Sequence, residues 1–175
     1  MAGCMPASPL LLGRFTRMTD IANLVGPNAK FFEDFTVGEE WVTPRRTITE
    51  ADLLMFSGLT GDFNPIHTDE EFAKTTAFGT RIFHGPAAFA VATGLESRLG
   101  IKEGTAIAFL GMDWNLKAPI MIGDTIHVFQ RVESVRPTSK GGRGIVVFWV
   151  EIRKQDGTVC QDGEWKVMFS CRDGN

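Results

Sequence analysis

The chain has 175 residues, which is the size of one ordinary domain and enough to bury a hydrophobic core. Hydrophobic residues make up 43% of it and charged residues 22%, so composition excludes a disordered, collagen-like or coiled-coil protein. The 18 Lys and Arg residues against 21 Asp and Glu give a net charge of −3. With no dense basic run, the sequence predicts neither a nucleic-acid partner nor a membrane surface.

Three cysteines, Cys4, Cys160 and Cys171, are far apart in the chain and form no C-x-x-C pair. They therefore suggest neither a disulfide framework nor a zinc site, and a reducing cytoplasm is the expected location. The first 17 residues contain a short apolar piece with Arg14 and Arg17, which faintly resembles a transit peptide. We expect residues 1–30 to form a tail outside the fold and residues 31–175 to form a single domain.

The first structured segments are expected to be short. The aromatic run from Phe31 to Gly38 predicts an apolar clasp on the core surface, and 41–48 has strand character. Because Pro44 cannot donate a ladder hydrogen bond, that strand belongs at a sheet edge. Thr49 and Asp52 then have the spacing of a capping box, which predicts a short helix ended by Ser57-Gly58.

Two more helices are expected before the sheet. Thr68 or Asp69 can cap a short helix at 70–74, after which 75–79 returns to a loop. Residues 86–99 are nearly all small or apolar until the last turn, which predicts a long helix buried on almost every side.

The last third of the chain changes to β-rich runs, which predict four strands. Their expected bounds are 106–115, 124–135, 144–154 and 159–170. We expect them to form an antiparallel meander, with a hairpin at Asp156-Gly157 and the third strand covered on both faces. A long helix with an antiparallel sheet wrapped around it is an α+β fold.

Asp62 and His67 are the leading catalytic candidates. Adding water to an activated double bond requires one group to take a proton and another to give one, and a carboxylate with an imidazole can share these tasks near neutral pH. The turn at Asn64-Pro65 can aim the two side chains at one point. The alternative is that Asp62 is a turn residue and His67 an ordinary polar group.

Phe83-His84-Gly85-Pro86 favours the catalytic interpretation. Pro86 is suited to the first turn of a helix, and Gly85 has no side chain to keep a ligand from its N–H. The positive end of the helix dipole would there polarise a thioester carbonyl as negative charge develops on it. His84 can shape this pocket or be a structural polar residue, and Thr93, two turns along, can line the cavity or only pack.

Three segments resemble the MaoC-like dehydratase family, which includes the (R)-specific enoyl-CoA hydratases. They are F-S-G-L-T-G-D-F-N-P-I-H-T-D at 56–69, F-A-K-T-T-A-F-G-T-R-I-F-H-G-P at 72–86 and M-D-W-N-L-K-A-P-I-M-I-G-D-T-I at 112–126. The resemblance covers about residues 31–170. It implies a hot-dog fold, in which an antiparallel sheet wraps a long central helix, and a homodimer or higher homo-oligomer whose sheets join edge to edge.

The same resemblance implies the chemistry. Asp62 and His67 would hold the reacting water, Asn64 would support them, and the N–H of Gly85 would bind the thioester oxygen. The reaction would be reversible syn hydration of a trans-2-enoyl-CoA to an (R)-3-hydroxyacyl-CoA, with coenzyme A as part of the substrate and neither a metal nor another cofactor. The sequence departs from relatives at Phe89, which is a bulky residue on the substrate side of the helix and leaves the acyl chain length open.

Basic residues are candidates for the phosphates of coenzyme A, because phosphate attracts Arg and Lys. They are Arg81, Lys117, Arg45 and Arg46. The alternative is that these charges only form a solvated face.

Three other functions stay open. The substrate could be a branched or dicarboxylic thioester of the mesaconyl or methylmalyl type. The protein could instead be a hot-dog thioesterase, or a non-catalytic acyl-CoA-binding protein.

Overall fold

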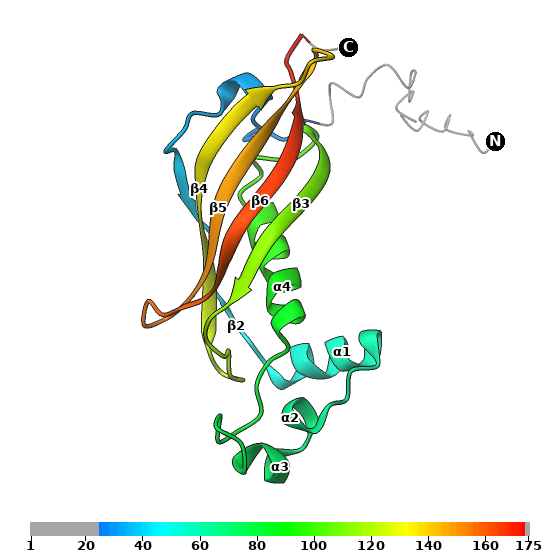
Figure 1. The fold of residues 1–175 in the computed structure, drawn as a ribbon, viewed down its shortest axis with the longest axis vertical. Helices are drawn as coiled ribbons and strands as arrows, with labels where there is room; N and C mark the ends of the chain where they lie inside the picture. The colour runs from blue at the N-terminus through cyan, green and yellow to red at the C-terminus, as the bar shows by residue number, and fades with distance from the viewer. Residues whose placement is uncertain (1–24, 174–175) are drawn as a thin grey trace, which may run out of the picture.

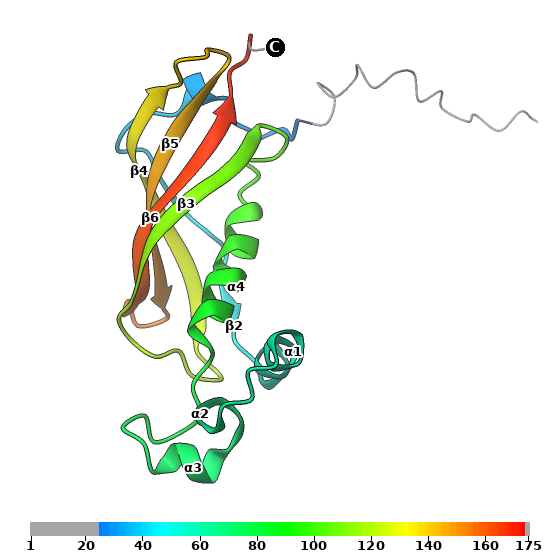
Figure 2. The ribbon, with the colours of Figure 1, turned by 45° about the vertical axis from the view of Figure 1, so that its right-hand side comes forward.

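The computed structural model describes residues 25–173 and consists of one antiparallel sheet with one long helix against it. Figures 1 and 2 show helix α4 (Gly85–Ser97) running along one face of the sheet, while α1 to α3 gather at one end of the molecule. The four long strands are β3 (Ala106–Leu116), β4 (Thr125–Pro137), β5 (Arg143–Lys154) and β6 (Val159–Ser170). These strands match the four β-rich runs, so the α+β expectation is confirmed.

Strand pairing differs from a simple meander. The order across the sheet is β1-β4-β5-β6-β3, so β4 to β6 follow one another but β3 pairs with β6 at the far edge. β4 cannot accept β3, because β5 occupies one of its sides and β1 (Glu40–Val42) and β2 (Arg46–Thr47) occupy the other. Segment 117–124 therefore carries the chain from one edge of the sheet to the other (Figure 1).

The core lies between the sheet and α4. Along β4 and β5 every second side chain is buried, including Val128 and Val132 on β4 and Phe148 on β5. The intervening side chains of β5, such as Trp149, are half-buried. The expectation that both faces of this strand are covered is therefore wrong for the single chain, because α4 packs against only one face.

The edge assignment of 41–48 is correct. Pro44 separates β1 from β2, and both pair with β4 at the edge of the sheet. The predicted clasp is a 3₁₀ turn, η2 (Phe32–Asp34), followed by Phe35, which is 5% exposed. The Phe35 ring lies 4.5 Å from that of Phe169 and 5.7 Å from that of Phe148, so the clasp packs on the core as expected.

Helix α1 (Glu50–Thr60) begins at the predicted capping box. The Thr49 side chain accepts from the Asp52 N–H, and the Asp52 side chain accepts from the Thr49 N–H at 2.9 Å. The helix does not end at Ser57-Gly58. It continues to Gly61, whose φ of 76° is the left-handed conformation that glycine adopts at helix ends, and whose N–H donates to the Ser57 carbonyl.

Two short helices follow. Asn64-Pro65 was expected to form a turn, but it begins helix α2 (Pro65–Thr68), in which Asn64 is the N-cap and Pro65 the first residue. Asp69 caps helix α3 (Glu70–Lys74), as predicted, by accepting from the Phe72 N–H at 3.0 Å.

Helix α4 is less buried than its composition suggests. Ala88, Ala92 and Leu95 face the core, whereas Pro86, Ala90 and Gly94 are exposed. The apolar composition of α4 led to the prediction of a helix buried all round. In the single chain the sheet covers only one side of it.

Lys30 joins the start of the described chain to the rest of the fold. It pairs with Glu39, and its N–H donates to the Ile101 carbonyl.

The two cysteines among the described residues are free thiols. Cys160 is buried and Cys171 half-buried, and burial raises the pKa of the Cys160 thiol to about 11. The piece that resembles a transit peptide, and Cys4 with it, lies outside the described residues. Within residues 25–173, no helix combines the length and the apolar character needed to cross a membrane.

Candidate active site

Asp62 sits just beyond α1 in a loop that fixes its backbone and leaves its side chain half exposed. Its N–H donates to the Thr60 hydroxyl at 3.2 Å, and its carbonyl lies 3.1 Å from Nε2 of His84. Oδ1 accepts from the Asn64 N–H at 3.2 Å. The carboxylate is therefore positioned by backbone contacts and stays open to solvent.

Asn64 supports the site with both its side-chain amide oxygen and its main-chain N–H. Its side chain accepts from the Ile66 N–H at 3.2 Å and so caps α2, the helix that carries His67. The Asn64 main-chain N–H holds Asp62 at the same time. One residue thereby fixes the spacing between the two candidate catalytic groups.

His67 is oriented by a single hydrogen bond. Its Nδ1 lies 2.8 Å from the Ile82 carbonyl oxygen. Because that oxygen can only accept, Nδ1 carries the proton and Nε2 is left as an acceptor. The ring thus presents a bare nitrogen that can take a proton from water.

His84 is a buried residue underneath the pair. It is 1% exposed, and its ring stacks on that of His67 with centroids 3.7 Å apart. Burial lowers the pKa of His84, and the Asp62 carbonyl opposes that change. Nε2 donates to this carbonyl, whereas Nδ1 has no partner among the described residues. His84 therefore contacts both Asp62 and His67, and its role in shaping the substrate pocket stays a prediction.

Asp62, His67 and His84 form a compact group. Each offers one ligand-type atom, and these atoms lie within 4.8 Å of one another. A metal bound by all three would have to take Nε2 of His84 away from the Asp62 carbonyl or use its buried Nδ1. The prediction that the site holds no metal stays a prediction.

Gly85 is the first residue of α4 and directly follows His84. Its N–H has no carbonyl of the preceding turn to bind, and it lies at the positive end of the helix dipole. A Cβ added here would meet Cδ2 of Leu116, which is the end of an exposed side chain and would have to move aside. The Gly85 carbonyl accepts from Nε2 of Gln161 at 3.0 Å, which ties the start of α4 to β6. Pro86, next along, is exposed.

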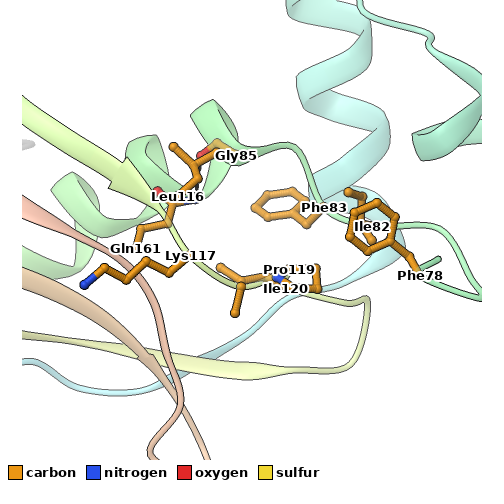
Figure 3. Close-up of a pocket in the computed structure, with 10 residues that line it drawn as sticks. Phe78, Ile82, Phe83, Gly85, Leu116, Lys117, Pro119, Ile120 and Gln161 are labelled. Atoms are coloured by element: carbon orange, nitrogen blue, oxygen red, sulfur yellow. Dashed lines mark hydrogen bonds between the residues drawn. The ribbon is translucent and has the colours of Figure 1, made fainter.

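A pocket of about 240 Å³, here called the front pocket, opens beside Gly85. Figure 3 shows Gly85 and Leu116 on one side of it and Phe83, Ile82 and Phe78 on the other. Asp62 and His67 do not line this pocket, but His67 binds the carbonyl of Ile82, which does. The candidate catalytic groups therefore stand next to the pocket.

Phe89 and Thr93 lie farther along α4. Both line a second pocket of about 510 Å³ between α4 and β3, here called the rear pocket. The Thr93 hydroxyl donates to the Ala90 carbonyl at 2.7 Å. These two residues are therefore one to two turns away from Gly85 along the helix.

Three of the four basic candidates have acidic partners within the chain. Arg81 makes two hydrogen bonds of 2.8 Å to Glu50 and one of 3.2 Å to Glu70. Lys117 lines the front pocket and pairs with the buried Asp162. Arg46 pairs with Asp52, whereas Arg45 has no ion pair among residues 25–173. Phosphate binding by any of the four stays a prediction, and three of them would have to leave or share a carboxylate.

Two features were missed by reasoning from the sequence. Gln161 links Gly85 to the indole of Trp114, whose Nε1 donates to Gln161 Oε1 at 2.8 Å. Glu96 and Lys102 form a buried ion pair beside the rear pocket. A lone acid inside an apolar helix was a usable signal for that pair, but nothing in the sequence marked Gln161.

The architecture defines the protein as a hot-dog protein with a cluster of one carboxylate and two imidazoles next to the start of its central helix. A Mycobacterium tuberculosis protein described as having a double hotdog fold superposes with a TM-score of 0.69 at 14% identity, over 83% of this chain and 46% of its own. The R-hydratase PhaJ1 of Pseudomonas aeruginosa superposes with a TM-score of 0.67 at 28% identity, over 81% of this chain and 86% of its own.

Residues 33–147 match the model of the MaoC like domain, and the chain belongs to this family. It is 36% identical to the (R)-specific enoyl-CoA hydratase of Rhodospirillum rubrum over 143 residues, which are 81% of this chain and 93% of the relative. It is 36% identical to the 3-hydroxybutyryl-CoA dehydratase of Methylorubrum extorquens, over 65% of this chain and 70% of the relative. It is also 39% identical to Protein MaoC of Klebsiella aerogenes over 68% of this chain, but it spans only 35% of that longer protein.

Proposed function

We propose that this protein reversibly hydrates trans-2-enoyl-CoA thioesters to (R)-3-hydroxyacyl-CoA. Family membership and the enzyme names of the relatives make it an enzyme of the hydratase and dehydratase class acting on acyl-CoA. The observation that carries the finer proposal is the pairing of an open carboxylate, Asp62, with the bare Nε2 of His67. Both lie next to His84, the residue that directly precedes Gly85.

In the proposed mechanism, water is held between Asp62 and His67. The pair takes one proton from the water as the water oxygen bonds to the β-carbon, and it delivers that proton to the α-carbon on the same face, so that Asp62 and His67 end in the protonation states in which they began. We assign the role of base to the pair and not to either residue alone. Negative charge that develops on the thioester oxygen would be stabilised by the Gly85 N–H and the dipole of α4.

The test is loss of enoyl-thioester absorbance when purified protein is added to crotonyl-CoA, with the chirality of the product determined. We expect (R)-3-hydroxybutyryl-CoA. Release of free thiol would instead indicate a thioesterase. Tight binding of unchanged crotonyl-CoA would indicate a non-catalytic binding protein. Turnover of branched or dicarboxylic enoyl-CoA alone would show that the substrate is a thioester of that class and not a linear enoyl-CoA.

We also propose a homodimer joined at β3. This strand is the edge of the sheet, and an unpaired edge is a template for another strand. Its exposed apolar side chains are Ile107, Phe109, Leu110, Met112 and Leu116. A second copy of the chain would cover them.

Leu110 tests the dimer because it is 46% exposed on β3 and lines neither the front nor the rear pocket. We expect wild type to sediment with the mass of two chains, and Leu110→Lys to shift toward one chain as a buried ammonium opposes the interface. A monomeric wild type would contradict the proposal.

A further inference from the structure

One face of α4 runs from the front pocket to the rear pocket. Gly85, Phe89, Thr93 and Glu96 are spaced by four, four and three residues, which places them on the same side of a helix. Gly85 lines the front pocket, and the other three line the rear pocket. The two pockets therefore lie in sequence along the helix, beginning at the residue that would bind the thioester oxygen.

Among the residues of α4 that line the rear pocket, Phe89 is the one that comes first after Gly85. Its ring centroid lies 5.8 Å from that of Trp114 on β3 and 5.2 Å from that of Trp165 on β6, both edge-on. It lies 6.5 Å from the ring of Phe109. Aromatic rings from α4, β3 and β6 thus meet around Phe89.

This aromatic wall is held in place from the front pocket. The Trp114 indole donates to Gln161, and the Gln161 amide donates to the carbonyl of Gly85. Trp165 is only 1% exposed, so its ring is confined by the core. A ligand that extended from Gly85 along α4 would consequently meet rings that are fixed by hydrogen bonds and packing.

We propose that Phe89 ends the acyl-binding site and restricts the enzyme to short-chain enoyl thioesters. This inference rests on the proposed function and names the substrate class of that site. Phe89 lies four positions after Gly85, about 6 Å along the helix axis, which is room for roughly four carbon–carbon bonds of ~1.5 Å beyond the thioester carbonyl. In this proposal, the ring of Phe89 keeps the acyl chain out of the rear pocket.

The test compares trans-2-butenoyl-CoA with trans-2-octenoyl-CoA. We expect wild type to favour the shorter substrate by about tenfold or more in kcat/KM, because a methylene that does not fit costs about that much. Phe89→Ala removes the ring at which the proposed acyl site ends, so we expect the ratio of octenoyl to butenoyl activity to rise about tenfold or more. Phe89→Leu, which keeps more of the core packing, is expected to give a smaller rise.

Val91→Ala is the matched control, because Val91 lies on α4 but lines the pocket between α1 and α4. It is expected to keep the wild-type ratio. An unchanged ratio in folded Phe89→Ala and Phe89→Leu, or a wild type that hydrates octenoyl-CoA as well as butenoyl-CoA, would overturn the inference. If wild type hydrates neither thioester, the proposed function itself fails and the chain-length inference falls with it.

Discussion

Replacing Asp62 by asparagine is expected to lower kcat for crotonyl-CoA hydration by about a hundred- to ten-thousand-fold, the usual contribution of a positioned acid or base. The amide keeps the shape of the side chain, and its oxygen can still accept from the Asn64 N–H, which now lies 3.2 Å from Oδ1. It can no longer take a proton. Because the Asp62 side chain is half exposed, we expect the melting temperature to change little.

His67→Gln is expected to give a loss of the same size for a different reason. A glutamine amide can still donate to the Ile82 carbonyl, but it offers no nitrogen that exchanges a proton near pH 7. The double variant is expected to lose little more than either single variant, because groups that act on one water are not additive. The measurement is the initial rate of absorbance loss, with a thermal melt to verify the fold.

Asp69→Asn is the matched control for Asp62→Asn. Asp69 lies seven positions along and caps α3, a role that asparagine fills as well as aspartate. We expect this variant to keep wild-type activity. If Asp62→Asn retained more than about a tenth of the wild-type rate, another group would have to take over the proton transfer assigned to Asp62.

Local signals in the sequence were sufficient for most helix starts. Thr49 with Asp52, and Asp69 alone, form the predicted caps because their partners lie within three residues. The end of α1 was misplaced, because two glycines, Gly58 and Gly61, compete for the same role. Only the second takes the left-handed conformation.

Features set by distant contacts were beyond reach of the sequence. The partner of β3 depends on which sides of β4 are already occupied, and the exposed side of α4 depends on what covers it. In the candidate site, too, nearby residues were recognised and distant contacts were not. Asp62 and His67 are five residues apart and were recognised together. Arg81 was a candidate for binding phosphate, and its ion pair with Glu50, 31 positions away, was not foreseen.

Glu96→Gln is expected to destabilise the protein by about 3–5 kcal/mol, the cost of leaving a buried charge without its partner. Glu96 is 5% exposed, and Lys102 lies over the rings of Phe148 and Trp165, at 4.7 and 5.6 Å from their centroids. Burial raises the pKa of Glu96 and lowers the pKa of Lys102, and each charge opposes the change in the other. Lys102 would lose that support in the variant.

The measurement is the free energy of unfolding from urea titrations at a fixed protein concentration. Glu71→Gln is the matched control, because the Glu71–Lys74 pair is exposed and should be worth less than about 1 kcal/mol. The double variant Glu96→Leu with Lys102→Met is expected to recover most of the lost stability, since no buried charge remains.

The pH dependence separates a lost charge pair from a simple packing defect. Without Glu96, the folded-state pKa of Lys102 falls further below its unfolded value of about 10.4, so the unfolded chain binds more protons between the two values. Stability of Glu96→Gln should therefore rise, relative to wild type, as the pH is raised from 7 toward 10. A deficit that stayed constant over this range would mean that Lys102 is not stranded as a charge and that the cost comes from packing around the rear pocket.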